Sequence, residues 1–272
     1  MERKLGITNA GLKDVSGMEA IGLIKNAGFD CFFTPAYDVK SVAAVKNEAE
    51  RVGLELEFIH GPFHATHPSG SPLYMNHCWK ASPDYVPLMD AILGSIDAAA
   101  AAEVKTVVLH VNGDWKPPKI SDIGLSRFDR IVSHAVRKGV RIAFENLRTH
   151  GTLAALMERY ERIPEVGFCY DCGHEHCYTE TIPYLDIFGK RTLCTHLHDN
   201  FGRDKEDPMK DMDAHYLPFE GNIDYAAMMQ KLDKYGYEGS LMLEVSQRHY
   251  GDISAEEFLA TAYDRVKKLS QM

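Results

Sequence analysis

Short apolar runs alternate with longer segments of helical periodicity along the whole chain. Eight runs have the length and residue types of β-strands, and they lie at Leu5–Thr8, Cys31–Thr34, Leu54–His60, Thr106–His110, Arg141–Glu145, Gly167–Asp171, Leu193–His198 and Leu241–Glu244. Helical spacing of apolar residues follows each run, at Gly17–Asn26, Val39–Arg51, Asp84–Ala102, Ser126–Lys138, Leu153–Tyr160, Thr181–Phe188, Tyr225–Tyr235 and Ala255–Leu269. The alternation predicts eight βα units.

Eight βα units in 272 residues favour an α/β fold of the (β/α)8 TIM barrel type, which takes about 250 residues. The chain has no Pro/Ser-rich linker or low-complexity tract, so we expect residues 1–272 to form one barrel domain. A doubly wound open sheet is the main alternative. The turn after the first strand, Thr8–Lys13, lacks the GxGxxG pattern of nucleotide-binding sheets, and the chain has no P-loop.

Polar residues close most of the predicted strands. The third to the eighth strand end in polar side chains, namely His60, His110, Glu145, Asp171, His196 with His198, and Glu244. In a barrel the active site forms at the C-terminal ends of the strands. Only His134 among the 13 histidines falls inside a predicted helix, which supports a chemical role for some of the others.

Glu145, Asp171 and Glu244 would converge in one cavity, where burying unpaired carboxylates costs on the order of several kcal/mol. A divalent cation removes this conflict. Two Glu, one Asp and one His are an oxygen-rich ligand set that suits Mn²⁺, Mg²⁺ or Co²⁺, and Zn²⁺ also fits. The alternative is that each carboxylate pairs with a Lys or Arg of a neighbouring loop. Because polar residues end several successive strands, we favour the metal site over separate ion pairs.

Composition restricts the partners. The 30 Lys and Arg against 39 Asp and Glu give a net charge of −9, which does not favour nucleic acid. No stretch approaches the roughly 18 apolar residues of a membrane-spanning helix, and the N-terminus lacks the apolar core of a signal peptide. Six scattered cysteines suit a reducing compartment, so we expect a cytoplasmic protein. Cys169 and Cys172 point to opposite faces of a strand, and no second CxxC completes a zinc ribbon.

The motifs along the second half of the chain are those of a known family. They are Phe144-Glu145-Asn146, Asp171-Cys172-Gly173-His174, His196-Leu197-His198-Asp199-Asn200, Asp213-Ala214-His215 followed by Phe219-Glu220-Gly221-Asn222-Ile223-Asp224, and Leu243-Glu244. In this order on a predicted barrel, the chain resembles the xylose-isomerase-like barrels. That superfamily includes sugar isomerases and epimerases together with the endonuclease IV-type apurinic endonucleases.

The resemblance implies a four-ligand metal site. Its ligands would be Glu145, Asp171, His196 and Glu244, with His196 preferred to His198 because the family's ligand lies three residues before an acidic residue, here Asp199. In the family's epimerases the two glutamates move a proton across an enediolate, so Glu145 and Glu244 are the catalytic candidates. His174 would contact substrate oxygens, and a cation would stabilise the developing enolate charge.

The endonuclease branch implies further ligands and a cluster of two or three Zn²⁺. The matching residues here are His110, His174, Asp213, His215, and His64 or His67, of which His67 is the preferred additional ligand. The negative net charge and a shortened loop after the third strand oppose a DNA substrate. Acidic residues after the seventh strand also oppose it, namely Asp204, Glu206, Asp207, Asp211 and Asp213.

Several residues past the strand ends are candidates for substrate binding. They are His60, His64, Trp115, His198, Arg148, Arg203 and Arg248. The three arginines could hold a carboxylate or phosphate, although a surface salt bridge is an equal alternative for each. Trp115 could form an apolar wall against a sugar ring, whereas Trp79 is expected to pack within its loop.

The sequence therefore predicts a divalent-metal-dependent isomerase or epimerase of a sugar, sugar phosphate or related polyhydroxy keto compound. A dehydratase or lyase on the same barrel is the first alternative, with His174 or His215 as an added base. An endonuclease IV-like zinc phosphodiesterase and a non-catalytic sugar-binding barrel are the others. We expect a small carbohydrate as the binding partner, no nucleic acid and no membrane, and the resemblance makes a homo-oligomer plausible.

Overall fold

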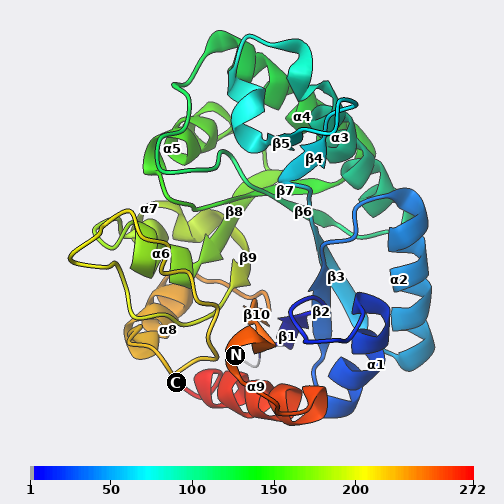
Figure 1. The fold of residues 1–272 in the computed structure, drawn as a ribbon, viewed down its shortest axis with the longest axis vertical. Helices are drawn as coiled ribbons and strands as arrows, with labels where there is room; N and C mark the ends of the chain where they lie inside the picture. The colour runs from blue at the N-terminus through cyan, green and yellow to red at the C-terminus, as the bar shows by residue number, and fades with distance from the viewer. Residues whose placement is uncertain (1–2) are drawn as a thin grey trace.

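Eight parallel strands form the centre of the molecule (Figure 1). The computed structural model describes residues 3–272, so Met1 and Glu2 of the expected domain lie outside it. The strands, in the order in which they neighbour one another, are β10 (Leu241–Leu243), β1 (Leu5–Thr8), β2 (Cys31–Thr34), β3 (Glu55–His60), β6 (Thr106–Leu109), β7 (Arg141–Glu145), β8 (Val166–Asp171) and β9 (Thr192–His196).

The sheet curls until its two edges meet. At one edge β1 pairs with β10 in the register Leu5↔Leu241, and at the other the residue after β9 forms a parallel bridge, Leu197↔Leu243. Leu197 donates its N–H to the carbonyl of Met242 at 2.8 Å and accepts from the N–H of Glu244 at 3.1 Å. The predicted (β/α)8 barrel is therefore confirmed.

Helices surround the strands on the outside (Figure 1). They are α1 (Gly17–Ala27), α2 (Val39–Val52), α3 (Val86–Ala101), α4 (Asp122–Lys138), α5 (His150–Arg159), α6 (Cys172–Tyr178), α7 (Tyr184–Phe188), α8 (Tyr225–Lys234) and α9 (Ala255–Leu269). Local sequence explains their ends. Ser16 and Glu19 form a capping box before α1, and Gly28 closes it in the left-handed conformation, which glycine adopts without steric cost.

The barrel interior is filled below the strand ends. Eight buried side chains form this layer, namely Cys31, Phe33, Phe58, Val108, Ala143, Cys169, Cys194 and Met242. Ala143, Cys169 and Cys194 had been expected there from the two-residue alternation along their strands. Because this floor is apolar and closed, the polar side chains two residues further along the chain, such as Glu145 beyond Ala143 and Asp171 beyond Cys169, are placed together above it.

Besides shifts of a few residues at element ends, such as helix α4, which begins at Asp122 and not at Ser126, two parts of the chain differ from the prediction. The segment after β3 is not a plain short loop, because β4 (His64–Thr66) and β5 (Pro72–Tyr74) form an antiparallel hairpin followed by the 3-10 turns η1 (Met75–Trp79) and η2 (Pro83–Tyr85). Trp79 is buried there and stacks on Phe128, as expected for a packing residue.

The other difference lies after β8. The predicted helix Thr181–Phe188 begins only at Tyr184, and the 3-10 turn η3 (Gly189–Arg191) follows it. Helix α6 was missed because its seven residues include Gly173 and two histidines, which have low helix propensity. Its start is set by Asp171, whose carboxylate accepts the His174 N–H at 2.6 Å.

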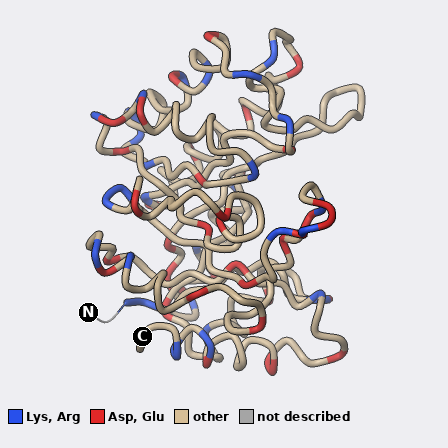
Figure 2. The backbone as a smooth tube through the Cα atoms, turned by 90° about the vertical axis from the view of Figure 1, so that its left-hand side faces the viewer, with Lys and Arg blue, Asp and Glu red and all other residues tan. Residues whose placement is uncertain are grey.

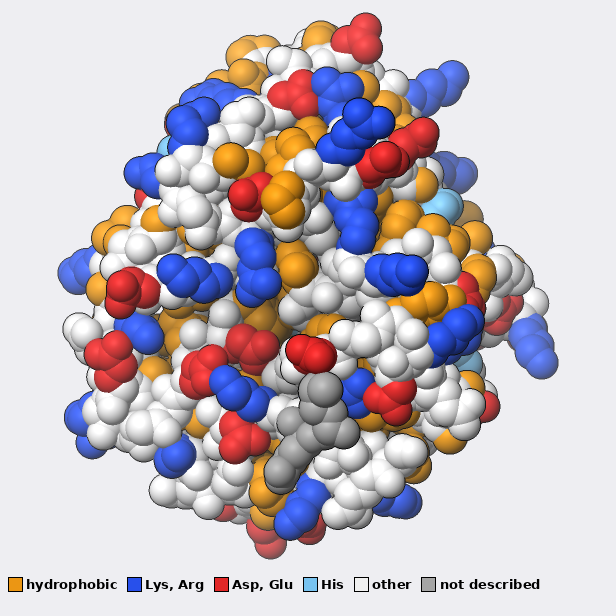
Figure 3. Space-filling model, turned by 180° about the vertical axis from the view of Figure 1, so that it is seen from behind, with side chains coloured by type: hydrophobic (Ala, Val, Ile, Leu, Met, Phe, Trp, Pro, Cys, Tyr) orange, Lys and Arg blue, Asp and Glu red, His pale blue; other side chains and the backbone are white. Residues whose placement is uncertain are grey.

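Charged residues of both signs are interspersed over the outside. Figure 2 shows Lys and Arg among Asp and Glu along the helices and loops, and the rear face in Figure 3 carries both signs side by side. Within residues 3–272, no helix has the length and apolar character needed to cross a membrane.

Candidate metal centre

Four side chains from neighbouring strand ends meet above the apolar floor. Glu145 ends β7, Asp171 ends β8, His196 ends β9, and Glu244 follows β10. One donor atom of each lies within 4.8 Å of the others. Glu145, Asp171 and His196 are buried, and Glu244 is the most open of the four because 22% of its side chain is exposed. We call this set the central group.

Three further sets of donors, defined by the same distance, adjoin the central group among residues 3–272. Two are made by His60, the first with His110 and Glu145 and the second with His196 and Glu244. The third set comprises His174, His198, Asp213 and His215, and we call it the outer group. Because Glu145 belongs to two sets, the arrangement could hold more than one cation.

The carboxylates of both groups have only histidine partners in the described chain. His110 Nε2 lies 3.2 Å from Glu145 Oε2, His196 Nδ1 lies 3.2 Å from Glu244 Oε2, and His198 Nε2 lies 3.1 Å from Asp171 Oδ1. Asp213 Oδ2 is shared by His174 Nε2 at 3.2 Å and His215 Nε2 at 3.1 Å. The alternative of carboxylates neutralised by Lys or Arg is therefore not what the structure shows.

The charges of this network shift the pKa values of its carboxylates and histidines. Burial alone would raise the pKa of Glu145, but the neighbouring His196 and His110 hold it well below the ordinary value. Burial would lower the pKa of His196, yet the carboxylates of Glu244 and Glu145 raise it to about 10. Burial would likewise lower the pKa of His215, but the Asp213 carboxylate raises it to about 9. Without a cation these histidines are protonated at neutral pH.

Three histidines are oriented by the main chain. His60 Nδ1 lies 2.9 Å from the carbonyl of Gly61, His174 Nδ1 lies 2.9 Å from that of Asn146, and His215 Nδ1 lies 2.6 Å from that of Glu244. Once a cation has displaced the proton on Nε2, a ring that donates from Nδ1 offers the Nε2 lone pair as a ligand. Metal-binding histidines are held in this manner, so the rings are prepared for coordination through Nε2.

Some buried polar atoms have histidine nitrogens nearby but form no well-aligned hydrogen bond, and they mark where a cation fits. Among the described residues they include Glu145 Oε2, His196 Nε2, His198 Nδ1 and Asp213 Oδ1. A buried unpartnered carboxylate oxygen is costly, and coordination would satisfy it. The donors are carboxylate oxygens and imidazole nitrogens, a combination that fits Mn²⁺, Co²⁺ or Zn²⁺.

Two polar residues that are not in the donor groups support the strand ends. The side chain of Asn146 donates to the carbonyl of Asp171 at 2.8 Å and accepts its N–H at 2.9 Å, which holds β8 beside β7. Asp199 accepts the N–H groups of Phe219 and Ile223 and thereby shapes the loop that follows β9. The motif residues Asn146 and Asp199 therefore act on the backbone.

Gly173 lets His198 lie against helix α6. A Cβ atom at position 173 would come within 1.9 Å of His198 Cε1. We expect Gly173→Ala to displace the His198 ring, to lower the free energy of unfolding by about 1–3 kcal/mol and to weaken metal binding by the outer group. Chemical denaturation and metal analysis measure both effects. Gly151→Ala is the control, because nothing lies within 4 Å of its Cβ position, and equal behaviour of the two variants would contradict the prediction.

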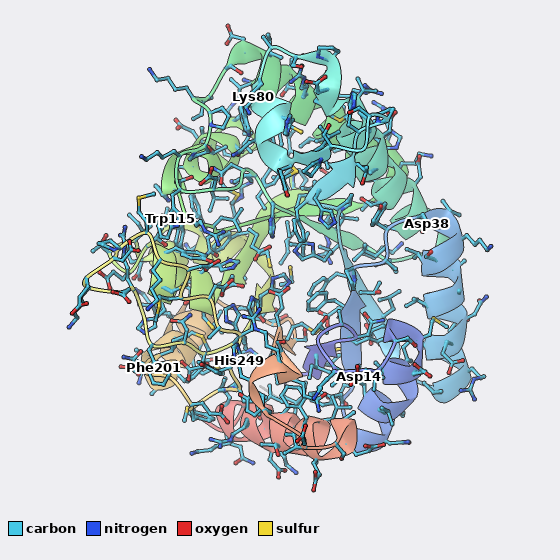
Figure 4. The ribbon with its side chains drawn as sticks, viewed as in Figure 1. Asp14, Asp38, Lys80, Trp115, Phe201 and His249 are labelled. Atoms are coloured by element: carbon cyan, nitrogen blue, oxygen red, sulfur yellow. The ribbon has the colours of Figure 1, made fainter. Side chains whose placement is uncertain are left out.

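The predicted substrate residues Arg148 and Arg203 both lie near Trp115, which is labelled at the left of Figure 4, with guanidinium groups 5.9 Å and 5.2 Å from its ring centre. The Arg148 guanidinium lies 4.2 Å from the ring centre of Tyr178 and pairs with Asp211 at 2.9 Å. Trp115 and Arg148 also line a cavity of about 590 Å³, so both can contact a molecule bound at the opening.

Other predicted residues are placed differently. His67 lies beside the β4–β5 hairpin, where its Nδ1 lies 2.7 Å from Ser69 Oγ, and it belongs to none of the donor groups in residues 3–272. His67, predicted as an additional ligand, therefore lies apart from the donor groups, whereas His60, predicted to bind substrate, lies 3.4 Å from Glu145. His64 is exposed on β4. Arg248 hydrogen-bonds to the backbone of residues 213 and 214.

Two aromatic residues of the site escaped the sequence reasoning. Phe63 stacks on His110 with a ring-centre distance of 4.8 Å, and Tyr178 stacks on His174 at 5.2 Å. Both cover the outer side of a histidine. Phe63 lies three residues after a strand end, which was the available signal, whereas Tyr178 lies on the helix that was not predicted.

Comparison with protein families identifies the class to which this barrel belongs. The family described as xylose isomerase-like TIM barrel matches residues 17–268. The chain therefore belongs to the xylose isomerase-like TIM barrel family, as its motifs had indicated.

Individual relatives are distant. An uncharacterised protein of Sinorhizobium fredii is 28% identical over 211 residues, which span 72% of this chain and 63% of that protein, less than two thirds of its length. A D-allulose 3-epimerase from Methylomonas sp. is similar in structure, with 16% identity, 98% of both chains covered and a TM-score of 0.71. The IolI protein, whose structure holds a zinc atom, has 17% identity, the same coverage and a TM-score of 0.76. At these identities the structural likeness shows the fold.

Proposed function

We propose that this protein is a divalent-metal-dependent isomerase or epimerase of a sugar, sugar phosphate or related polyhydroxy keto compound. The central group carries the proposal, because Glu145, Asp171, His196 and Glu244 place two glutamates around one cation position. The similarity to a D-allulose 3-epimerase and to the zinc-binding IolI protein supports it. We propose Mn²⁺ as the cation, with Zn²⁺, Co²⁺ or Mg²⁺ as the alternatives.

The side chains suggest a division of work. A cation in the central group would stabilise negative charge on the substrate oxygens next to the reacting carbon. In this proposal Glu244, the more exposed glutamate, would accept a proton from that carbon, and Glu145 would return one. His174, whose Nε2 faces Asp213, would contact a substrate oxygen. Trp115 and Arg148 would bind the part of the substrate that extends into the cavity at the opening.

The experiment that tests the proposal measures exchange of the hydrogen on the carbon next to the substrate carbonyl. Protein loaded with Mn²⁺ is incubated in D₂O with ketoses, aldoses and their phosphates, and proton NMR records exchange next to the carbonyl and the appearance of an isomer. We expect both for at least one substrate. Glu244→Gln is expected to abolish exchange, with the bound metal measured in parallel. Loss of water instead indicates the dehydratase, and binding without exchange indicates a non-catalytic barrel.

A second function is favoured by one specific observation. The outer group and the set formed by His60, His110 and Glu145 adjoin the central group, and adjacent cations are typical of phosphoester hydrolysis. This would be the endonuclease IV-like zinc phosphodiesterase chemistry. The net charge of −9 favours a small ester over DNA. Release of nitrophenol from bis(p-nitrophenyl) phosphate by the Zn²⁺-loaded protein, without any proton exchange on sugars, would support it.

A further inference from the structure

One arginine at the barrel opening binds the backbone next to the outer group. Arg248 lies on the 3-10 turn η4 (Gln247–His249), whose neighbouring residue His249 is labelled in Figure 4. One terminal nitrogen of its guanidinium donates to the carbonyl of Asp213 at 2.8 Å and to that of Ala214 at 3.1 Å. Its Nε donates to His249 Nε2 at 2.8 Å. The side chain is thus engaged with the protein.

The segment that Arg248 binds needs to be held in place. His215 has a positive φ of 53°, which is uncommon for a residue with a side chain. This turn directs the side chains of Asp213 and His215 to the same side, where they meet His174 and His198 in the outer group.

Turn η4 is itself fixed to the barrel. Gln247 is buried, accepts the Lys13 N–H at 2.9 Å and donates to the carbonyl of Ile253 at 2.7 Å. The preceding residue, Ser246, donates its N–H to the carbonyl of His215 at 3.0 Å. The segment from Glu244 to Arg248 therefore joins a ligand candidate of the central group to the backbone of the outer group.

We propose that Arg248 is a positioning residue for metal binding by the outer group, in place of the substrate contact that the sequence suggested. By binding two successive carbonyls it keeps the Asp213–His215 segment in the conformation that brings both side chains inward. A lysine, with a compact ammonium on a flexible stem, reproduces this contact poorly. Residues that orient ligands in this way alter metal affinity by about 10–100-fold. The inference shares with the proposed function the premise that metal binds here, and it does not depend on the reaction.

The test measures metal affinity and the hydrogen exchange of backbone amides, and it does not depend on enzymatic turnover. The wild type, Arg248→Met, Arg248→Lys and Asp213→Asn are loaded with Zn²⁺, and the metal per chain and its resistance to a competing chelator are determined. Hydrogen exchange of the amides of residues 213–216 is measured on the same samples. Arg162→Met is the control, because 95% of its side chain is exposed. Thermal unfolding verifies that each variant is folded.

We expect Asp213→Asn to lose one metal class, Arg248→Met to bind that same class about 10–100-fold more weakly, and Arg248→Lys to be intermediate. Amide exchange at 213–216 should accelerate in Arg248→Met and not in Arg162→Met. The proposal is overturned if Arg248→Met keeps wild-type affinity and exchange, or if Asp213→Asn binds as much metal as the wild type. If Arg248→Met selectively loses metal but the wild type turns over no sugar, the role of Arg248 is upheld and the proposed function fails.

Discussion

Glu145→Gln is expected to remove activity almost completely and to release metal from more than one place. Glu145 is buried, contributes a donor to the central group and also to the set with His60 and His110. The amide of glutamine keeps the shape but loses the charge that both sets share. A general base of this kind contributes about 10²–10⁴-fold to a rate, so we expect a loss of turnover in that range or beyond it.

Metal analysis distinguishes this effect from a loss of fold. The variant should retain the circular dichroism of the wild type while its metal content falls. Glu55→Gln is the matched control, because Glu55 begins β3 at the opposite end of the barrel and pairs with Lys4 at the surface. If Glu145→Gln kept wild-type metal content and turnover, the metal centre described above would be incorrect.

The second large effect is a pH dependence of opposite sign in the metal-free and the metal-loaded protein. The pKa of His196 is raised to about 10 and that of His215 to about 9 by their carboxylate partners, against about 6.5 in an unfolded chain. A raised folded-state pKa contributes stability that is fully present below pH 6.5 and is lost as the pH rises through the folded value. We therefore expect the metal-free protein to melt at falling temperatures between pH 7 and pH 10.

Metal affinity should change in the other direction over the same range. A cation must displace the protons on His196 and His215, so affinity should rise about tenfold per pH unit for each proton displaced. Calorimetry in buffers of different ionisation enthalpy measures the number of protons released at pH 7.5. His215→Gln should release one proton fewer than the wild type. His134→Gln is the control, since His134 pairs with Asp97 on the outside of the barrel. An affinity that is independent of pH would rule out this coupling.

Much of the fold could be read from local pattern. The strands at Leu5–Thr8, Cys31–Thr34 and Arg141–Glu145 were predicted with their observed bounds, because a fully buried strand is a short apolar run between turn residues. The helix Ala255–Leu269 was predicted equally well, since Ser254 caps it and apolar residues recur on one face. By contrast, the turn η1 that follows the β4–β5 hairpin and the helix α6 have weak local signals. Each makes contacts with distant residues, Trp79 of η1 with Phe128 and His174 of α6 with Asn146.

The site residues at the strand ends could be predicted from the sequence, whereas those on loops could not. Glu145, Asp171 and His196 end their strands, and a parallel barrel brings strand ends together whatever the loops do. Whether they bind metal and catalyse the proposed reaction remains a prediction. Residues on loops were harder to place. His67 lies in the turn of a hairpin that the sequence did not reveal, 3.9 Å from Asp84, whereas His60 at the end of β3 lies 3.4 Å from Glu145.

The sequence by itself thus determined the barrel, its family and the residues at the strand ends, because alternation, caps and motif order are local properties of the chain. Only the tertiary structure decided that the carboxylates have histidine partners throughout, that Asp213 and His215 join His174 and His198, and that Arg248 binds the backbone. These features depend on which loops meet across the opening. Such meetings are set by packing between segments that lie far apart in the sequence.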